Sequence, residues 1–310
     1  MSSDQINQLL KRIDHVKALI ASHRPLSPAI LKRLREQWVL EWTYNSNAIE
    51  GNTLTLRETK MVLEDGLTIG GKSLVEHLET INHKEAIEFV EELVNVKTLI
   101  TERELKDIHA LILRKIDNDY AGRYRDMQVR ITGSKHTPPA PLQVPQAMHE
   151  FATKYLVHPQ GHPVEQAALA HFHLVAIHPF VDGNGRTARL LMNLILMQHG
   201  YPPAVILKND RKKYYDTLEK SHARQNKAAP LNDFIFFVGR ALERTLGLYV
   251  SAIPKLNSAT LTMAQAEKFS PYSKEYLGLM ARRGVLPAFK LKRDWVVLQH
   301  DLEDYVKKQS

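Results

Sequence analysis

One stretch decides the fold of this 310-residue chain: His178-Pro179-Phe180-Val181-Asp182-Gly183-Asn184-Gly185-Arg186-Thr187-Ala188-Arg189. An apolar helical pattern opens at Pro163 and ends at Ile177. His178 leaves that helix, because the residue before a proline is biased away from the α region. A new helical pattern begins at Arg186. The stretch therefore predicts two helices joined by a short polar loop.

The centre of this loop has the composition of an anion-binding nest. Gly and Asn tolerate positive φ, so Gly183, Asn184 and Gly185 can turn successive N–H groups toward one point. The helix that follows adds the positive end of its dipole. Arg186 and Arg189 lie on one face of its first turn, and their guanidinium groups match phosphate oxygens. We therefore expect the loop to bind phosphate.

Two further side chains frame the loop. Asp182 precedes the glycines, and Mg²⁺ prefers one or two carboxylates together with phosphate oxygens. His178 has a pKa suited to removing a proton from an incoming hydroxyl group. Each of these residues alone is common at helix ends and turns. Their conjunction predicts group transfer from a Mg-bound nucleotide to a hydroxyl.

The charge of the chain is unevenly distributed. It carries 42 Lys and Arg against 34 Asp and Glu, a net charge of +8. Residues 1–200 hold 23 basic and 23 acidic side chains, so the whole excess follows residue 200. A basic excess favours nucleic acid or another acidic partner, and here that indication belongs to the C-terminal part of the chain.

Composition also limits the chemistry and the location. The chain has no cysteine, which excludes disulfides, a thiol nucleophile and Cys-ligated metal sites and fits a reducing compartment. The first 20 residues form a mixed-charge amphipathic pattern rather than a signal peptide. The most apolar stretch, Leu190–Met197, is far shorter than the roughly 20 residues of a membrane span. We expect a cytoplasmic protein without membrane contact.

Helix signals dominate the remaining sequence, so the expected fold class is mainly α. A capping-box pattern at Thr101–Glu104, for example, opens a predicted helix. Segment 124–145 differs, because apolar and polar residues alternate from Met127 to Ile131 before a Gly133-Ser134 turn and a proline cluster. This pattern predicts a short β-hairpin or flap.

The stretch from His178 to Arg189 resembles the Fic motif, HPFx(D/E)GNGRxxR, at every fixed position. The resemblance implies a Fic-type helical bundle and, most often, transfer of AMP from ATP to a Ser, Thr or Tyr hydroxyl of a protein. Phosphocholine or phosphate transfer also occurs in the family. His178 would be the general base and Asp182 the Mg²⁺ ligand. The implied ATP-binding residues here are Asp182, Gly183, Asn184, Gly185, Arg186, Thr187 and Arg189.

Three other segments extend the resemblance. The family's flap, which borders the nucleotide and holds the target, corresponds to Ile131, Thr132, Gly133 and Ser134. Tyr214 and Tyr215 resemble the paired aromatic residues after the motif helix, with Tyr215 bordering the adenosine. His222 falls where some relatives carry an Asn that contacts the base. The resemblance therefore adds these residues to the expected ATP site.

A second motif lies upstream, at residues 46–51. Ser46, Glu50 and Gly51 match the family's inhibitory pattern, (S/T)xxxE(G/N). Glu50 alone would be typical of a solvated acid at a helix end. Beside the motif arginines it is expected to pair with Arg189, removing a partner of the γ-phosphate and adding negative charge there. The resemblance implies the class with an N-terminal inhibitory helix, autoinhibited as folded.

The pattern changes after a predicted linker at 254–261. Residues 262–310 indicate two short helices, one or two strands between Phe289 and Leu298 with a tight turn at Arg293-Asp294, and a final helix. This outline resembles a winged helix-turn-helix module. Its basic residues favour DNA, and binding to protein or packing on the core is the open alternative. The other expected domains are an N-terminal helical region, 1–104, and a Fic catalytic core, 105–253.

The sequence thus predicts a protein adenylyltransferase with ATP and Mg²⁺ as substrate and cofactor and a protein hydroxyl as acceptor. Self-modification and a homodimer are further predictions. Two alternatives stay open. The same site can remove AMP if a glutamate such as Glu50 aligns a water molecule. The chain can also be a DNA-binding regulator whose Fic core serves as a sensor or toxin module.

Overall fold

The computed structural model describes residues 1–223, 231–291 and 294–309. The chain divides into two compact units, one formed by Gln37–Val238 and the other by Met1–Glu36 with Gly239–Ser310. Helices α2 (Pro28–Glu50) and α10 (Asn232–Ala252) each run from one unit into the other along the sequence. The predicted phosphate loop lies in the first of these units.

The unit Gln37–Val238 is helical, as the sequence predicts. No strand occurs among its described residues. Short 3₁₀ turns lie at Pro141–Gln143 and Lys208–Asp210, and a π-helical turn lies at Thr153–Val157. Besides parts of α2 and α10, its helices are α3 (Leu56–Asp65), α4 (Leu74–Asn95), α5 (Glu102–Leu113), α6 (Val144–Ala152), α7 (Pro163–Ile177), α8 (Asn184–Gln198) and α9 (Arg211–His222).

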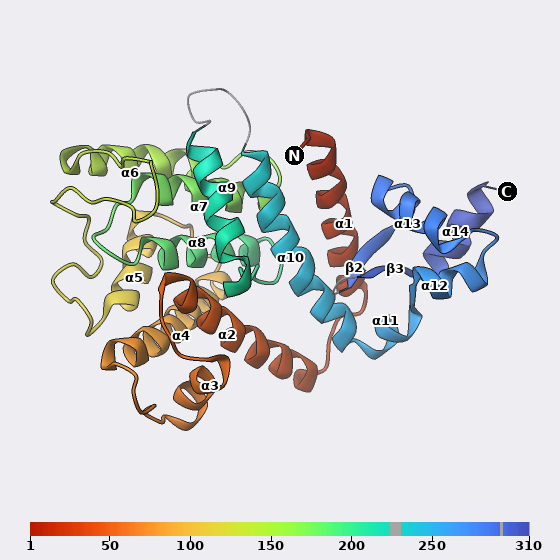
Figure 1. Cartoon of the computed structure of the whole chain (residues 1–310), viewed down its shortest axis with the longest axis horizontal. Coiled ribbons are helices and arrows are strands. Elements are labelled where there is room, and N and C mark those ends of the chain that lie inside the picture. Colours follow the sequence, from red (N-terminus) through yellow and green to blue (C-terminus); the bar gives the residue numbers. More distant parts are fainter. Residues whose placement is uncertain (224–230, 292–293, 310) are drawn as a thin grey trace. The chain divides into compact units, whose positions relative to one another are not determined.

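Helix α8 is the central helix of this bundle (Figure 1). It packs against α4, α5 and α7, and every residue from Arg186 to Leu196 is buried. A helix that is apolar on most sides is stable only in the interior of a protein. Burial of α8 therefore fixes the position of the loop that precedes it.

Local signals set the ends of several helices. Thr101 caps α5, and Glu104 accepts the backbone N–H of Thr101 at 2.8 Å, which confirms the predicted capping box. Helix α7 begins at Pro163 and ends at Ile177, as predicted. Helix α8 begins at Asn184, slightly earlier than the sequence indicates. The predicted arrangement of two helices around a polar loop is confirmed.

The predicted β-hairpin is wrong, because residues 125–140 form an irregular extended segment without strand. The expected turn is present: the N–H of Ser134 binds the carbonyl of Ile131 at 3.1 Å, and Gly133 has a φ of 78°. Pro138-Pro139 in the returning arm has no N–H to donate, so a hydrogen-bonded ladder cannot continue there. The flap is an extended loop.

The other unit contains a small sheet and helices (Figure 1). Strand β3 (Asp294–Leu298) lies between β1 (Thr260–Thr262) and β2 (Ala288–Leu291), and both pairs are antiparallel, with Ala288 opposite Val297. Nowhere in the described part of the chain does a helix have the length and hydropathy needed to cross a bilayer. Besides parts of α2 and α10, the helices are α1 (Ser3–Ser22), α11 (Pro254–Ala259), α12 (Met263–Ala266), α13 (Lys274–Arg283) and α14 (Gln299–Gln309), with a 3₁₀ turn at Glu267–Phe269.

The elements from α12 to α14 follow the predicted order of helix, helix, two strands and helix. Leu277, Leu286, Val297 and Leu302 belong to one apolar core of this region. The predicted tight turn at Arg293-Asp294 lies partly outside the described residues. The assignment of residues 262–310 as a winged helix-turn-helix module stays a prediction.

Residues 254–261, the predicted linker, have regular structure. They form α11 and the first part of β1. Leu256 is buried, and Leu261 joins the apolar core of the C-terminal region. Burial of these two side chains draws a segment of mostly polar composition into regular structure.

Helix α1 explains why the compact units differ from the predicted division at residue 104. Leu9 and Ile13 of α1 pack against Gly239 of α10, where an added Cβ would lie 2.8 Å from Leu9. Arg12 binds Glu243 at 3.2 Å, across 231 positions of sequence. The apolar stripe of α1 is buried as its helical spacing predicts: Ile6, Leu9, Leu10, Ile13, Val16 and Ile20.

Candidate active site

His178 forms the C-terminal cap of α7 in a left-handed conformation, with φ 51° and ψ 57°. Residues other than Gly, Asn and Asp rarely adopt this conformation. Its N–H binds the carbonyl of Leu174 at 2.9 Å, so the residue is still tied to the helix. Strained backbone of this kind persists only where neighbouring contacts hold it, and it clusters at functional sites.

The imidazole of His178 is held as one tautomer. Its Nδ1 lies 3.3 Å from the carbonyl oxygen of Val175. A carbonyl only accepts, so Nδ1 carries the proton and Nε2 presents a lone pair. Burial lowers the pKa of His178 below 6.5, although the bond to Val175 opposes the shift. His178 is therefore neutral at pH 7, the form that can accept a proton.

The loop between α7 and α8 is closed by its own residues. Gly183 has a φ of 75°, and an added Cβ would lie 3.3 Å from the ring of His109. The buried side chain of Asn184 accepts the N–H of Phe180 at 3.0 Å and donates to its carbonyl at 2.9 Å. The side chain of Asn184 thus serves the loop itself, and the predicted phosphate contact falls to its backbone N–H.

His109, which the sequence patterns did not indicate, supports the loop from α5. Its Nε2 donates to the carbonyl of Asp182 at 2.9 Å, and its Nδ1 accepts the N–H of Gly122 at 2.9 Å. Its ring stacks on Phe180 with the centroids 3.6 Å apart. Burial lowers the pKa of His109 to about 4, so the ring stays neutral and both hydrogen bonds keep their direction.

Arg125, also missed from sequence, is buried at the base of the flap. Its Nε donates to the carbonyl of His178 at 2.8 Å. Its Nη1 and Nη2 donate to the carbonyls of Met127 at 3.0 Å and Pro139 at 2.6 Å. One guanidinium group therefore joins both arms of the flap to the backbone of the candidate base.

The guanidinium group of Arg186 lies between two carboxylates. Its Nη1 donates to Oε1 of Glu79 at 2.8 Å, and its Nη2 donates to Oδ2 of Asp182 at 3.1 Å. The side chain of Arg186 is 3% exposed, whereas that of Asp182 is 68% exposed. Asp182 is thus open to solvent beside the loop, and Glu79 is the more buried partner.

The guanidinium group of Arg189 is bound to the end of α2. Its Nη2 lies 2.7 Å from Oε1 of Glu50 and 2.8 Å from the carbonyl of Ser46, and its Nε donates to the Ser46 hydroxyl at 3.0 Å. Burial opposes the charge of Arg189, but the carboxylate of Glu50, together with Tyr214 and Tyr215, raises the pKa. Gly51 follows with a φ of 111°.

The carboxylate of Glu50 also lies against the N-terminus of α8. A Cβ added to Gly185 would collide with Oε1 of Glu50 and lie 3.1 Å from Nη1 of Arg189. Glu50 ends α2, where the helix dipole disfavours negative charge, whereas the start of α8 favours it. An acid of the protein therefore occupies the region in which the loop is expected to bind phosphate.

Tyr214 and Tyr215 come from α9. Tyr214 is buried, with its hydroxyl 2.9 Å from Nε2 of His171 and its ring centroid 6.0 Å from the guanidinium carbon of Arg189. Tyr215 is partly buried, and its ring centroid lies 4.8 Å from the guanidinium carbon of Arg211. Burial raises the pKa of both tyrosines, so both stay protonated.

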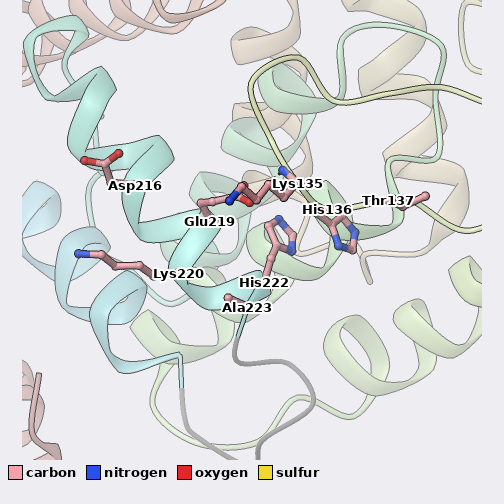
Figure 2. A pocket seen from close by; sticks show the side chains of 8 residues that line it. All are labelled: Lys135, His136, Thr137, Asp216, Glu219, Lys220, His222 and Ala223. Atoms are coloured by element: carbon pink, nitrogen blue, oxygen red, sulfur yellow. Dashed lines mark hydrogen bonds between the residues drawn. The ribbon is translucent and has the colours of Figure 1, made fainter.

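The tip of the flap is fastened to α9. Glu219 accepts the hydroxyl of Ser134 at 2.5 Å and the N–H of Lys135 at 2.9 Å. The rings of His136 and His222 stack with their centroids 4.0 Å apart and their planes 8° apart, side by side in Figure 2. The predicted site residues Ser134 and His222 are thereby brought together.

A pocket of about 690 Å³ opens between the flap and α9 (Figure 2). Its volume lies in the range of small-molecule sites, about 300–1,000 Å³. His136 also donates from Nε2 to the carbonyl of Ala176 at 2.8 Å, so the pocket wall is tied to the end of α7 that carries His178. The residues that line it are Lys135, His136, Thr137, Asp216, Glu219, Lys220, His222 and Ala223.

Some predicted residues lie outside these contacts. The side chain of Thr187 is fully buried and has no hydrogen-bond partner among the described residues. Thr132 and Gly133 are exposed at the turn of the flap, and Ile131 is half-buried. The structure thus brings the motif residues and Glu50 into one site and the flap tip and His222 into an adjoining pocket.

These features define a class of protein: a helical bundle with a glycine-containing loop at the N-terminus of a buried helix, a neutral histidine that caps the preceding helix, and a carboxylate of its own on a buried arginine. Residues 99–196 match the Fic/DOC family. A Fic-domain signalling protein from Bacteroides thetaiotaomicron shares 32% identity and a TM-score of 0.69, over 80% of this chain and 96% of that one. The chain belongs to the Fic/DOC family.

Two further relatives extend the likeness. Fic-1 from C. elegans is 31% identical, with a TM-score of 0.71 over 81% of this chain and 73% of that one. The Aedes aegypti protein named Protein adenylyltransferase Fic is 38% identical over 259 residues, which are 82% of this chain and 50% of that protein. The chain spans about half the length of the curated relatives it matches.

Proposed function

We propose that this protein transfers AMP from ATP to a hydroxyl group of a protein. The observation that carries the proposal is the neutral imidazole of His178 beside an anion-binding loop with two arginines. Nε2 of His178 takes the proton of the hydroxyl, whose oxygen bonds to the α-phosphorus of ATP. The bond from that phosphorus to the oxygen bridging to the β-phosphate breaks, and pyrophosphate leaves. The curated names of the relatives support this choice.

The remaining site residues position the nucleotide. Backbone N–H groups from Gly183 to Gly185 bind the phosphates at the positive end of α8. Arg186 and Arg189 neutralise the β- and γ-phosphates that become the leaving group. The nucleoside lies toward α9, and the flap holds both nucleotide and target. The supporting observation is the pocket between flap and α9.

The residues present fit a magnesium ion that arrives with ATP. Among the described residues no three His, Asp or Glu side chains gather into a metal site. Asp182, with 68% of its side chain exposed beside the loop, is the single carboxylate that Mg²⁺ needs when phosphates supply other ligands. The ion would neutralise charge on the phosphates. His109 would hold Asp182 in place through its backbone carbonyl.

The resting protein is autoinhibited by Glu50 in this proposal. Its carboxylate takes the guanidinium group that the γ-phosphate needs and lies against Gly185. ATP then binds weakly, or in a pose unsuited to in-line attack on the α-phosphorus. The Glu50 side chain is 31% exposed, so it can be displaced from one side without opening the core.

The same carboxylate favours a second candidate, removal of AMP from a modified protein. Glu50 is held by Arg189 and lies close enough to raise the pKa of His178 by its charge. An acid so placed can align water for attack on the phosphorus of an AMP–protein ester. Addition and removal of AMP share one site. Glu50 inhibits the addition and assists the removal.

The position of the label in ATP tests the proposal. With the Glu50→Gly variant and a protein acceptor, ATP labelled at the α-phosphate is expected to label protein, and ATP labelled at the γ-phosphate is not. The reason is that the loop and arginines hold the β- and γ-phosphates as the leaving group. Autoradiography of separated proteins measures both. Transfer of the γ-label instead would replace this proposal by phosphate transfer.

The pH dependence tests the role of His178. Because burial lowers its pKa below 6.5, the base form persists as pH falls through 6.5. We expect the acid limb of kcat/KM of the Glu50→Gly variant to be centred below pH 6.5, since kcat/KM reports groups of the free enzyme. Removal of Glu50 takes away a charge that raises this pKa, which strengthens the expectation. An acid limb centred above pH 6.5 would assign the base elsewhere.

Other partners stay predictions. The acceptor hydroxyl belongs to another protein or, in self-modification, to this chain, and a homodimer is a further prediction. DNA contact through residues 262–310 gains no specific support. The ring of Trp295, in the predicted wing, is already contacted by Arg12 of α1, whose guanidinium carbon lies 5.1 Å from the ring centroid. AMP transfer is the activity that the described residues support best.

A further inference from the structure

The carboxylate of Glu79 joins two parts of the site that are far apart in sequence. Its Oε1 accepts Nη1 of Arg186 at 2.8 Å, across 107 positions. Its Oε2 accepts Nδ2 of Asn52, two residues beyond Glu50, at 2.9 Å. The Glu79 side chain is 17% exposed. One carboxylate thus contacts both a phosphate-binding arginine and the turn that ends the inhibitory helix.

The turn after Glu50 is bound to α4 through Asn52 and Thr53. The N–H and the hydroxyl of Thr53 donate to Oε1 of Glu76 at 2.8 Å and 2.6 Å. The buried side chain of Asn52 also donates to the carbonyl of Glu76 at 3.0 Å and accepts the N–H of Leu54 at 3.0 Å. Asn47, before Glu50, donates to the backbone carbonyl of Glu79 at 3.2 Å. Residues on both sides of Glu50 are therefore held by the same short segment of α4.

Arg186 depends on Glu79 for its orientation. A buried guanidinium group needs a partner that satisfies its charge, and a carboxylate fixes the plane in which its donors point. The other partner, Asp182, is largely exposed and is the expected Mg²⁺ ligand, so it is the weaker support. Nε of Arg186 is buried without a hydrogen-bond partner among the described residues. Glu79 is the contact that holds the group in place.

We propose that Glu79 is a positioning residue with two separable roles: it orients Arg186 for phosphate, and through Asn52 it keeps Glu50 on Arg189. The proposal rests on the proposed function and concerns regulation of that same site. The two contacts of the Glu79 carboxylate then have opposite effects on activity. Loss of the Asn52 contact relieves inhibition, whereas loss of the Arg186 contact weakens nucleotide binding whether or not Glu50 is present.

Three substitutions separate these roles. Asn52→Ala removes the contact of Glu79 with the turn after Glu50, together with the bonds of Asn52 to Glu76 and Leu54, and leaves the contact with Arg186 in place. Glu79→Gln keeps the size of the side chain but removes its charge and one of the two oxygens that accept from Arg186 and Asn52. Glu88→Gln is the matched control, because Glu88 lies on the same helix, has a side chain that is 44% exposed and pairs with Lys84 at 3.9 Å. Each is made with Glu50 present and with Glu50→Gly.

The proposal predicts a crossed pattern of rates and affinities. In the Glu50→Gly background, Glu79→Gln raises KM for ATP about ten- to a hundredfold and changes kcat less, while Asn52→Ala has no effect. With Glu50 present, Asn52→Ala raises the rate about three- to tenfold, and Glu79→Gln gives no activation. Glu88→Gln changes nothing. A purely structural defect would lower the active fraction, and so apparent kcat, without raising KM.

ATP affinity of the same proteins in a His178→Ala background, measured by calorimetry, separates this inference from the proposed function. If the Glu50→Gly protein binds ATP but transfers nothing, AMP transfer fails as a function while Glu79 is still tested by affinity. Weaker binding for Glu79→Gln and tighter binding for Asn52→Ala with Glu50 present support the proposal. Binding of Glu79→Gln equal to that of Glu88→Gln, or of Asn52→Ala equal to its unsubstituted parent, overturns it.

Discussion

Replacement of Glu50 by glycine is expected to raise AMP transfer about ten- to a hundredfold. The carboxylate holds Nη2 of Arg189 at 2.7 Å and lies against Gly185, so its removal frees the arginine and the start of α8 for phosphate. A charge-assisted hydrogen bond is worth about 1.5–3 kcal/mol, and about 1.4 kcal/mol is a factor of ten. Initial rates with α-labelled ATP, together with ATP affinity by calorimetry, measure the effect.

A control variant separates inhibition from a general effect on α2. Glu36→Gly places glycine inside the same helix, at an exposed residue that pairs with Lys32 at 3.8 Å, and should not activate. If Glu50→Gly changes neither rate nor affinity, the contact with Arg189 is not inhibitory. Incubation of a pre-adenylylated target with the unsubstituted enzyme tests which reaction the resting enzyme performs. If the unsubstituted enzyme removes AMP and Glu50→Gly does not, the second candidate is favoured.

Replacement of His178 by alanine is expected to lower transfer about 10²- to 10⁴-fold, the usual contribution of a general base. The measurement is made in the Glu50→Gly background with α-labelled ATP and a protein acceptor. ATP affinity should be preserved, because the imidazole donates to the carbonyl of Val175 and not to the loop. The expected loss is therefore in turnover rather than in binding.

His173→Ala is the matched control for this variant. His173 lies one turn earlier on α7, where its ring stacks on Tyr155 at 4.4 Å, and burial lowers its pKa to about 4. His173→Ala removes a partly buried imidazole of the same helix outside the site. Undiminished transfer by His178→Ala, or an equal loss in both variants with equal melting temperatures, would remove His178 from its assigned role.

The local parts of the site could be predicted from the sequence. The break between α7 and α8 follows from His178-Pro179 and the glycines, which act through backbone conformation alone. The sequence also places Arg186 and Arg189 on one helix face. In the structure they have different partners, Glu79 and Asp182 for Arg186 and Glu50 and Ser46 for Arg189.

The residues that the sequence did not indicate act across long separations. His109 contacts the loop across 73 positions, Arg125 contacts His178 across 53, and Glu79 contacts Arg186 across 107. Each is an ordinary polar residue in a helical or irregular segment, with no periodicity or motif to mark it. Their roles arise only when α4, α5 and the flap pack around α8.

In the flap, a sequence pattern was present but the structure that it predicts did not form. Alternation from Met127 to Ile131 is a valid strand signal, but a strand also needs a partner with donors, and Pro138-Pro139 supplies none. The side chain of Arg125 takes the carbonyls that a ladder would have used. A pattern that describes one arm of a hairpin therefore cannot establish the hairpin.

The burial of Arg189 has a consequence for how this protein can be switched on. The guanidinium group is 2% exposed and cannot lose its proton, so it must face a negative charge in every stable state. A signal that merely pulls α2 away would strand a cation in the interior. If the proposed function holds, activation is an exchange of anions, in which the triphosphate replaces the carboxylate, and a rise in ATP competes with Glu50.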